Sequence, residues 1–193
     1  MTRDIDVRRK LHETVAAEFS TDPGSIILDE FCVLDGECRI DLAIVNGQLH
    51  GYEIKSDADT LDRLPAQLAA YNAVFDRITI VAGSRHAEKA FGMVPHWWGL
   101  TTAVTEGRRV VLRRERATHV NEHIDPVAVA GLLWRDEVST VLKQRCGGHG
   151  LSGHPRALLR KLLAALMPVD ELRAVVRTAL KQRKDWRPDA MRI

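Results

Sequence analysis

The chain has 193 residues, of which 45% are hydrophobic and 28% charged, with a formal net charge of +2. These values are typical of a globular protein with one domain of ordinary size and a small appendage. No run approaches the roughly 18 apolar residues of a membrane helix, and residues 1–10 lack the apolar segment of a secretory signal. Three cysteines make no disulfide framework, so we expect a cytoplasmic protein.

The charge is unevenly distributed. Residues 1–126 contain 15 Lys/Arg and 20 Asp/Glu, whereas residues 127–193 contain 13 Lys/Arg and 6 Asp/Glu. A basic C-terminal region beside an acidic N-terminal one is typical of proteins that handle phosphodiesters, with the basic part contacting phosphate. Solvated helix faces would give the same pattern.

The N-terminal part predicts a helix followed by a strand. Apolar residues at helical spacing, starting at Ile5, predict an amphipathic helix over residues 4–19. Residues 25–34 predict a strand that Asp29-Glu30 interrupts. Acidic residues inside an apolar strand are seldom buried unless they are paired or bind metal. Asp35-Gly36 predicts the turn that follows.

A β-hairpin is predicted next. Residues 39–45 alternate polar and apolar side chains, with Ile40, Leu42 and Ile44 on one side. Asn46-Gly47 is a strong hairpin-turn signal, and the return strand covers residues 48–55.

Three charged residues of this hairpin are candidates for a functional site. Glu53 and Lys55 are two residues apart on one strand and therefore point the same way, and Asp41 lies on the neighbouring strand. Two converging carboxylates form an oxygen-rich site that suits Mg²⁺ or Mn²⁺, and an adjacent lysine can hold a water molecule or stabilise charge on a phosphoryl group. A Glu–Lys pair on a solvated strand face is the alternative.

A helix and a further strand follow the hairpin. Leucines and aromatic residues at helical spacing predict a helix that starts near Asp62, with Pro65 in its first turn. Gln67 and Tyr71 are four residues apart and share one face of this helix. The apolar run 77–82 predicts a buried strand, which a crossover helix would place parallel to its neighbour.

The spacing of these residues resembles a known signature. Asp41, followed after eleven residues by Glu53-Ile54-Lys55, is similar to the D…(D/E)-X-K motif of the PD-(D/E)XK nuclease superfamily, although Ile40 stands where the motif has proline. Gln67-Leu-Ala-Ala-Tyr71 resembles the Q-x-x-x-Y motif of its RecB-like members.

The resemblance extends to a third acid. The run from Asp29-Glu30-Phe31 to Gly36-Glu37-Cys38-Arg39-Ile40-Asp41 is similar to a pattern in MmcB-like bacterial nucleases of the DNA-repair type. This implies that Glu30 joins Asp41 and Glu53 as a metal ligand. Pairing of Glu30 with Arg39 across the hairpin is the alternative.

The remaining chain predicts more strands and then helices. Adjacent Trp97 and Trp98 lead into a strand, and the arginine-rich run 108–114 predicts a basic edge strand. The expected elements are a helix at 85–91, strands at 101–104 and 108–114, and helices at 127–142, 156–167 and 169–184. Residues 142–163 faintly resemble a SAP-type DNA-binding module; packing against the preceding domain or dimerisation is the alternative.

We therefore expect an α/β fold of the restriction-endonuclease-like kind, a mixed sheet flanked by helices. Residues 1–120 would form this nuclease-like domain and residues 121–193 a basic helical extension. The resemblance implies a Mg²⁺- or Mn²⁺-dependent nuclease acting on DNA, or else on RNA. Its implied metal ligands are Asp41, Glu53 and Glu30, and its implied catalytic and positioning residues include Lys55, Gln67 and Tyr71.

Several alternatives remain open at this point. A non-catalytic DNA- or partner-binding module on the same fold is the second hypothesis, and a direct Glu53–Lys55 ion pair without bound metal would favour it. A small-molecule phosphohydrolase is disfavoured because no P-loop or other nucleotide fingerprint is present. The first helix of this superfamily can lend a residue to the site, and the candidates are His12, Glu13 and Glu18.

Overall fold

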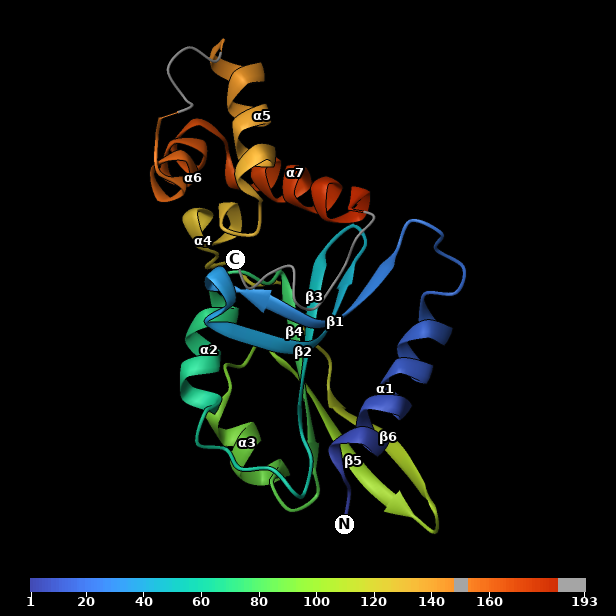
Figure 1. The fold of residues 1–193 in the computed structure, drawn as a ribbon. Helices are drawn as coiled ribbons and strands as arrows, with labels where there is room; N and C mark the ends of the chain where they lie inside the picture. The colour runs from blue at the N-terminus through green and yellow to red at the C-terminus, as the bar shows by residue number, and fades with distance from the viewer. Residues whose placement is uncertain (148–152, 184–193) are drawn as a thin grey trace.

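A computed structural model of the chain describes residues 1–147 and 153–183 (Figure 1). Within these residues six strands form one sheet, in which they lie in chain order. The strands are β1 (Ile26–Val33), β2 (Cys38–Val45), β3 (Leu49–Lys55), β4 (Arg77–Gly83), β5 (Gly99–Glu106) and β6 (Arg109–Arg116).

The sheet is mixed, as the sequence predicts. Strands β1, β2 and β3 form an antiparallel meander, β4 and β5 each continue the sheet in parallel, and β6 returns antiparallel at the edge. The two parallel connections contain helices. The helices of the chain are α1 (Asp4–Glu18), α2 (Leu64–Asn72), α3 (Ala87–Met93), α4 (Pro126–Ala130), α5 (Arg135–Cys146), α6 (Arg156–Leu166) and α7 (Val169–Gln182).

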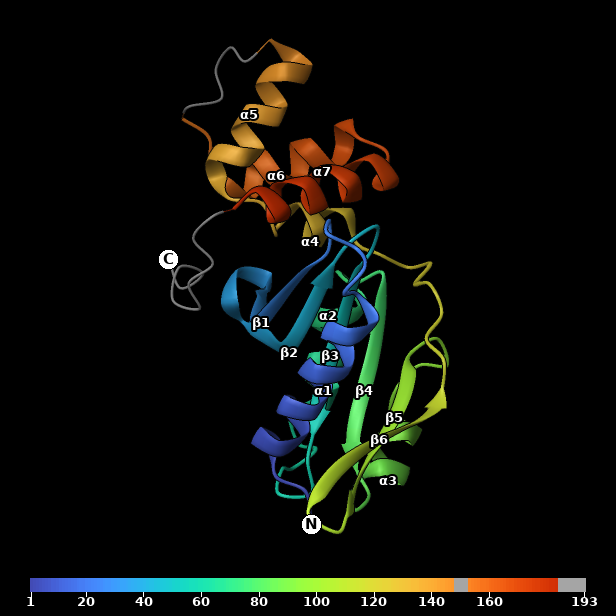
Figure 2. The same cartoon turned by 90° about the vertical axis from the view of Figure 1, so that its right-hand side faces the viewer.

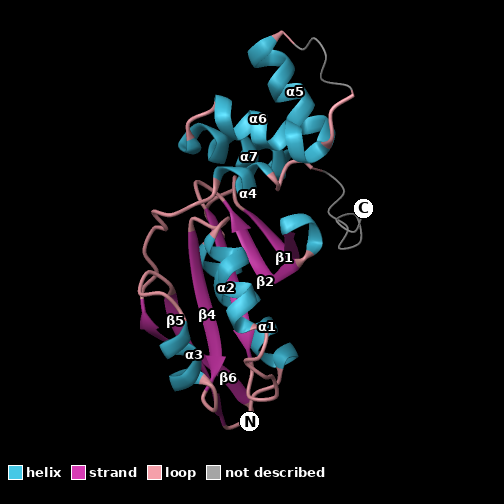
Figure 3. Ribbon diagram, turned by 90° about the vertical axis from the view of Figure 1, so that its left-hand side faces the viewer, coloured by secondary structure: helices cyan, strands magenta, loops and turns pink. Residues whose placement is uncertain are grey.

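Helices cover both faces of the sheet. Helix α1 crosses one face (Figure 2) and α2 and α3 cover the other (Figure 3). On the α1 face, Val7, Leu11 and Val15 pack against Leu42, Ile44, Tyr52 and Ile54. The larger core lies on the α2 face around Tyr71, Phe75 and Trp98. The prediction of an α/β fold with helices on a mixed sheet is therefore confirmed.

Two predicted side-chain placements are wrong. Ile40 does not share a side with Leu42 and Ile44, because it lies in the core of the α2 face while they contact α1. Opposite this point, Glu30 in β1 has φ of 53°, a left-handed conformation that distorts the local pleat. Ile5, which the helical spacing assigns to the apolar stripe, is 66% exposed.

The hairpin itself is present with a longer turn than expected. Three residues, Asn46 to Gln48, connect β2 and β3, and the register pairs Val45 with Leu49. Asn46 accepts the Gln48 N–H through its side chain at 2.8 Å. Gly51 of β3 lies at a tightly packed point, because a Cβ there would lie 2.4 Å from Cδ1 of Ile40.

The C-terminal helices pack against one end of the sheet (Figure 1). The single helix predicted over residues 127–142 is wrong, because the chain turns at Gly131–Trp134 and forms α4 and α5 instead. Leu159 and Leu163 of α6 and Leu172 of α7 belong to the same apolar cluster as the sheet core. The SAP-like pattern lies partly in residues 148–152, outside the described residues.

Ion pairs fasten these helices to the sheet. Arg160 of α6 donates to both oxygens of Asp35 at 2.5 and 2.6 Å. Asp76, which is 2% exposed, accepts from Arg173 of α7 and from the Leu49 N–H at 2.6 Å. This second carboxylate therefore joins α7 to the start of β3.

We predict that Asp76→Ala lowers the free energy of unfolding by about 3 kcal/mol, because it leaves the Arg173 guanidinium and the Leu49 N–H without their buried acceptor. Urea titration measures this. The matched control is Asp170→Ala. The Asp170 carboxylate lies 3.0 Å from the same arginine, but its side chain is 87% exposed. Its loss should lower the free energy of unfolding by less than about 1 kcal/mol. Equal losses in the two variants would contradict the prediction.

Candidate active site

A buried ion pair lies at the end of strand β3. Nζ of Lys55 donates to Oε1 of Glu53 at 2.5 Å, and the two side chains are 5% and 3% exposed. The alternation of β3 turns both toward α2, since Tyr52 before them and Ile54 between them belong to the α1 face. The alternative of a solvated surface pair is thereby excluded.

Helix α2 supplies two polar residues to this pair. Gln67 accepts from Nζ of Lys55 at 3.0 Å and donates to Oε1 of Glu53 at 2.8 Å. The Tyr71 hydroxyl lies 2.9 Å from Oε2 of Glu53 and 2.6 Å from the Arg39 carbonyl oxygen. Glu53, Lys55, Gln67 and Tyr71 therefore form one hydrogen-bonded cluster.

Asp41 occupies the point where β2 and β3 separate. The paired residues of these strands run from Val45–Leu49 to Leu42–Tyr52, and beyond them the strands are no longer paired. There Oδ2 of Asp41 accepts the Ile54 N–H at 2.6 Å. The carboxylate thus replaces a backbone acceptor at the end of the ladder.

Arg8 of helix α1 is the cation that faces Asp41. It donates to Oδ1 of Asp41 at 2.6 Å and to the Asp41 carbonyl at 3.1 Å, and it lies 2.7 Å from Oε1 of Glu30. The second oxygen of Glu30 lies 2.5 Å from Nε of Arg39. Glu30 therefore pairs with Arg39, as the alternative predicted, and it also contacts the Arg8 that faces Asp41.

These side chains surround a cavity of about 520 Å³. Its lining includes Arg8, Glu30, Asp41, Glu53, Lys55 and Gln67, while Tyr71 lies behind it and is fully buried. Asp4 and Arg63 also line the cavity. The cavity is therefore bounded by α1, the β1–β2–β3 meander and the start of α2.

The first-helix residues singled out from the sequence do not line this cavity. His12 contacts Asp29 at 2.6 Å, Glu13 pairs with Lys10, and Glu18 lies elsewhere on α1. Arg8 and Asp4 line it instead. Arg8 was not among the residues predicted from the sequence, where its one signal is a basic side chain one helical turn before His12.

Burial sets the protonation of the cluster. Burial, reinforced by the charge of Asp41, raises the pKa of Glu53 to about 7 even though Lys55 and Tyr71 oppose the shift. Burial also raises the pKa of Asp41, against the Ile54 N–H and Arg8. The pKa of Tyr71 is raised by burial and by Glu53, so its hydroxyl stays neutral.

The protonation state of Glu53 determines which hydrogen bonds Tyr71 makes. The hydroxyl has two acceptors within reach but a single hydrogen to donate. When Glu53 is ionised, Tyr71 can donate to Glu53; when Glu53 is protonated, the carboxyl can donate to Tyr71 while Tyr71 donates to the Arg39 carbonyl. The cluster therefore accommodates both states of a carboxyl that titrates near neutral pH.

Asp41 and Glu53 are the residues that fit a divalent metal ion. Within residues 1–147 and 153–183, no three His, Cys, Asp or Glu side chains are grouped as metal ligands, so Glu30 is not assembled with them. Two carboxylates are nevertheless what Mg²⁺ commonly takes from a protein when water and substrate phosphate supply the rest. Each carboxylate now contacts a cationic side chain, which carries the compensating charge.

The fold and site define a mixed α/β protein with a buried acid–lysine cluster that opens into a polar cavity. The family described as Bacteriophage P4 protein cII matches residues 5–190. The chain therefore belongs to the Bacteriophage P4 protein cII family.

Two individual proteins are similar to the chain. Protein cII of Enterobacteria phage P4 is 28% identical over 157 residues, which cover 81% of this chain and 59% of that protein. The chain thus spans less than two thirds of that relative. A solved structure, the SPO1766 protein of unknown function from Silicibacter pomeroyi, matches with 17% identity and a TM-score of 0.39, over 73% of this chain and 90% of that one.

In the metal-free protein, Glu53 should make stability fall as pH rises. Its unfolded-state pKa is 4.5 and its folded-state pKa about 7, so the folded protein holds a proton that the unfolded chain has lost. The stabilising contribution is full below pH 4.5 and disappears as the pH rises through 7, an effect on the order of 3 kcal/mol. Asp41, with its raised pKa, acts in the same direction.

Urea titrations in EDTA between pH 4.5 and 8, on the parent and on Glu53→Gln, measure this contribution. The difference between the two proteins should shift in favour of Glu53→Gln as the pH rises. Parallel pH profiles would show that Glu53 ionises normally in the folded protein.

Proposed function

We propose that this protein is a Mg²⁺- or Mn²⁺-dependent nuclease that hydrolyses DNA phosphodiester bonds. The observation that carries the proposal is the buried Lys55, held between Glu53 and Gln67 in a cavity that Asp41 also lines. A buried ion pair adds little to stability compared with apolar packing. A cluster of perturbed carboxylates at a cavity is instead typical of catalytic sites.

Each residue has a distinct role in this proposal. Asp41 and Glu53 would hold the divalent ion, which when bound neutralises phosphate charge and lowers the pKa of water. Lys55 orients the attacking water and stabilises negative charge on the phosphoryl oxygens. Gln67 and Tyr71 hold Lys55 and Glu53 in place, since their hydrogen bonds reach both.

The arginines of the polar cavity support a phosphodiester substrate, although acidic side chains outnumber cationic ones in its lining. Arg8, Arg39 and Arg63 lie on its lining together with the carboxylates, and arginine suits phosphate because its guanidinium forms paired hydrogen bonds. The proposed location is the cytoplasm, because the three cysteines are thiols rather than disulfides. The part of the chain that the structure describes contains no helix long and apolar enough to span a membrane.

The prediction for activity is that purified protein with Mn²⁺ nicks or degrades DNA, and that Lys55→Met lowers the rate at least 100-fold, because the charge that positions water and phosphate is lost. Methionine keeps the volume of the aliphatic stem. Glu53 can accept a proton in this variant, so no unpaired charge is left buried. Gel assays on single-stranded, duplex and branched DNA measure the rate.

The matched control is Lys89→Met, which removes an exposed lysine on α3 and should leave cleavage unchanged. Circular dichroism and thermal melting report whether both variants fold. Absence of cleavage of every substrate with either divalent ion would refute the nuclease assignment, as would a Lys55→Met protein that is as active as the parent.

A non-catalytic DNA- or partner-binding module is the second candidate, and one observation favours it. The Glu53–Lys55 contact at 2.5 Å and the Arg8–Asp41 contact at 2.6 Å already neutralise both carboxylates. Titration with Mn²⁺, followed by electron paramagnetic resonance, separates the candidates. Stoichiometric binding that Asp41→Asn abolishes supports the nuclease; DNA binding without any metal binding supports the module.

A further inference from the structure

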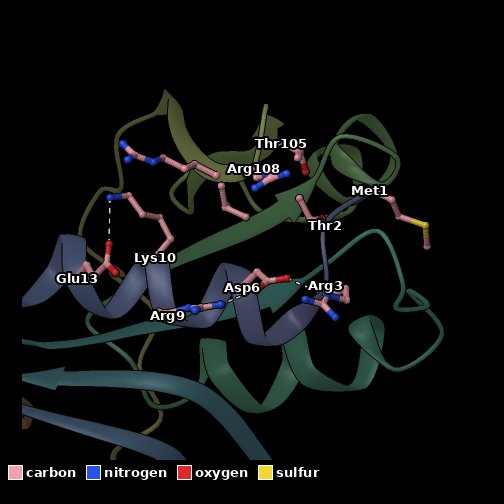
Figure 4. A pocket seen from close by; sticks show the side chains of 11 residues that line it. Met1, Thr2, Arg3, Asp6, Arg9, Lys10, Glu13, Thr105 and Arg108 are labelled. Atoms are coloured by element: carbon pink, nitrogen blue, oxygen red, sulfur yellow. Dashed lines mark hydrogen bonds and ion pairs between the residues drawn. The ribbon is translucent and has the colours of Figure 1, made fainter.

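A second cavity lies on the other side of helix α1. It measures about 540 Å³ and lies between the start of α1 and the turn of the β5–β6 hairpin. Figure 4 shows the two sides, with Arg108 of the hairpin opposite Asp6 and Lys10 of the helix. Its charged lining residues are Arg3, Asp6, Arg9, Lys10, Glu13, Arg108 and Arg109; we call this lining the basic groove.

The basic groove carries an excess of positive charge. Five of the residues just named are cationic and two are acidic, although residues 1–126 as a whole hold more acids than bases. Four of the five cations are arginines, which bind phosphate in paired hydrogen bonds and are weakly hydrated. A local surplus of positive charge within an acidic segment indicates a site for an anionic ligand.

The two hairpin arginines are available for such a ligand. Arg108 and Arg109 are exposed and make no side-chain hydrogen bond or ion pair with other residues among those described. On the helix side, Asp6 alone serves both Arg3, at 2.9 Å, and Arg9, at 2.5 Å. Exposed pairs of this kind contribute about 0–1 kcal/mol, so a phosphate can replace the carboxylate at little cost.

Helix α1 forms a wall of both cavities. Asp4 and Arg8 line the candidate active site, while Asp6, Arg9 and Lys10 line the basic groove. The two openings therefore lie on either side of the same helical turns, separated by a helix of about 10–12 Å diameter. A mononucleotide is too short to contact both, whereas a polynucleotide that crosses the helix presents several phosphates to the groove.

We propose that the basic groove binds the phosphate backbone of the polynucleotide whose scissile bond occupies the site of Asp41, Glu53 and Lys55. The proposal rests on the proposed nuclease function for the identity of its ligand. The groove holds the nucleic acid by charge, independent of sequence, and α1 sets the spacing between the bound backbone and the reacting phosphodiester. Anionic lipid is the competing ligand, which the experiment tests separately.

The test measures binding without cleavage. A fluorescent duplex of about 20 base pairs is titrated in EDTA at several salt concentrations, and anisotropy gives the affinity. Arg108→Glu/Arg109→Glu should weaken binding at least tenfold at about 0.1 M salt, and should reduce the slope of log affinity against log salt by about 2. Arg9→Glu/Lys10→Glu, on the opposite side of the groove, should have the same effect.

The control is Lys89→Glu/Lys161→Glu, which makes the same change of net charge at exposed positions outside the groove and should alter affinity less than about twofold. An equal loss of affinity in this control overturns the proposal, since the change in overall charge would then explain the weaker binding. Binding of the parent to phosphatidylserine vesicles but not to the duplex also overturns it, in favour of a membrane surface.

These outcomes are distinguishable from failure of the nuclease proposal. Loss of duplex binding in the groove variants supports the groove even when the parent cleaves no DNA. Conversely, suppose that the two groove variants bind the duplex as the parent does while cleavage still depends on Lys55. That result overturns the proposal for the groove and leaves the nuclease proposal standing.

Discussion

The buried contact between Lys55 and Glu53 organises the site. Two charged side chains at 5% and 3% exposure are costly to remove from water, and their mutual attraction offsets that cost only when the remaining hydrogen-bonding groups are satisfied. Gln67 bonds to both members of the pair and Tyr71 to Glu53. The packing of α2 against β3 is therefore constrained by polar geometry as well as by apolar contact, because a shift of the helix would remove the hydrogen bonds of Gln67 and Tyr71 from the buried pair.

Local pattern was sufficient to predict much of this arrangement. The period-two alternation of β3 put Glu53 and Lys55 on one face, and the four-residue spacing of Gln67 and Tyr71 put them on one helix face. The parallel placement of β4 followed from the crossover. These relations depend on residues close in sequence, whose directions are fixed by the element that contains them.

Relations between distant elements were not predictable in this way. Arg8 reaches Asp41 across 33 residues, and this contact depends on where α1 crosses the sheet. The change of side at Ile40 accompanies the left-handed conformation of Glu30, which is unusual for a glutamate. The break between α4 and α5 was missed because the apolar spacing continues through Gly131, while tertiary packing turns the chain there.

The net charge of a segment also differs from the charge that is available to a ligand, because some cations are already paired with carboxylates. Residues 127–193 have the larger surplus of Lys/Arg, yet Arg160 pairs with Asp35 and Arg173 with Asp76, and Arg183 binds Glu137 at 2.5 Å. Those guanidinium groups hold the helices to one another and to the sheet. Arg108 and Arg109, in the segment with more acids than bases, have no such partners among the described residues. Because a phosphate gains most from a cation that has no carboxylate to give up, Arg108 and Arg109 at the β5–β6 turn are better suited to bind a phosphate than Arg160, Arg173 and Arg183.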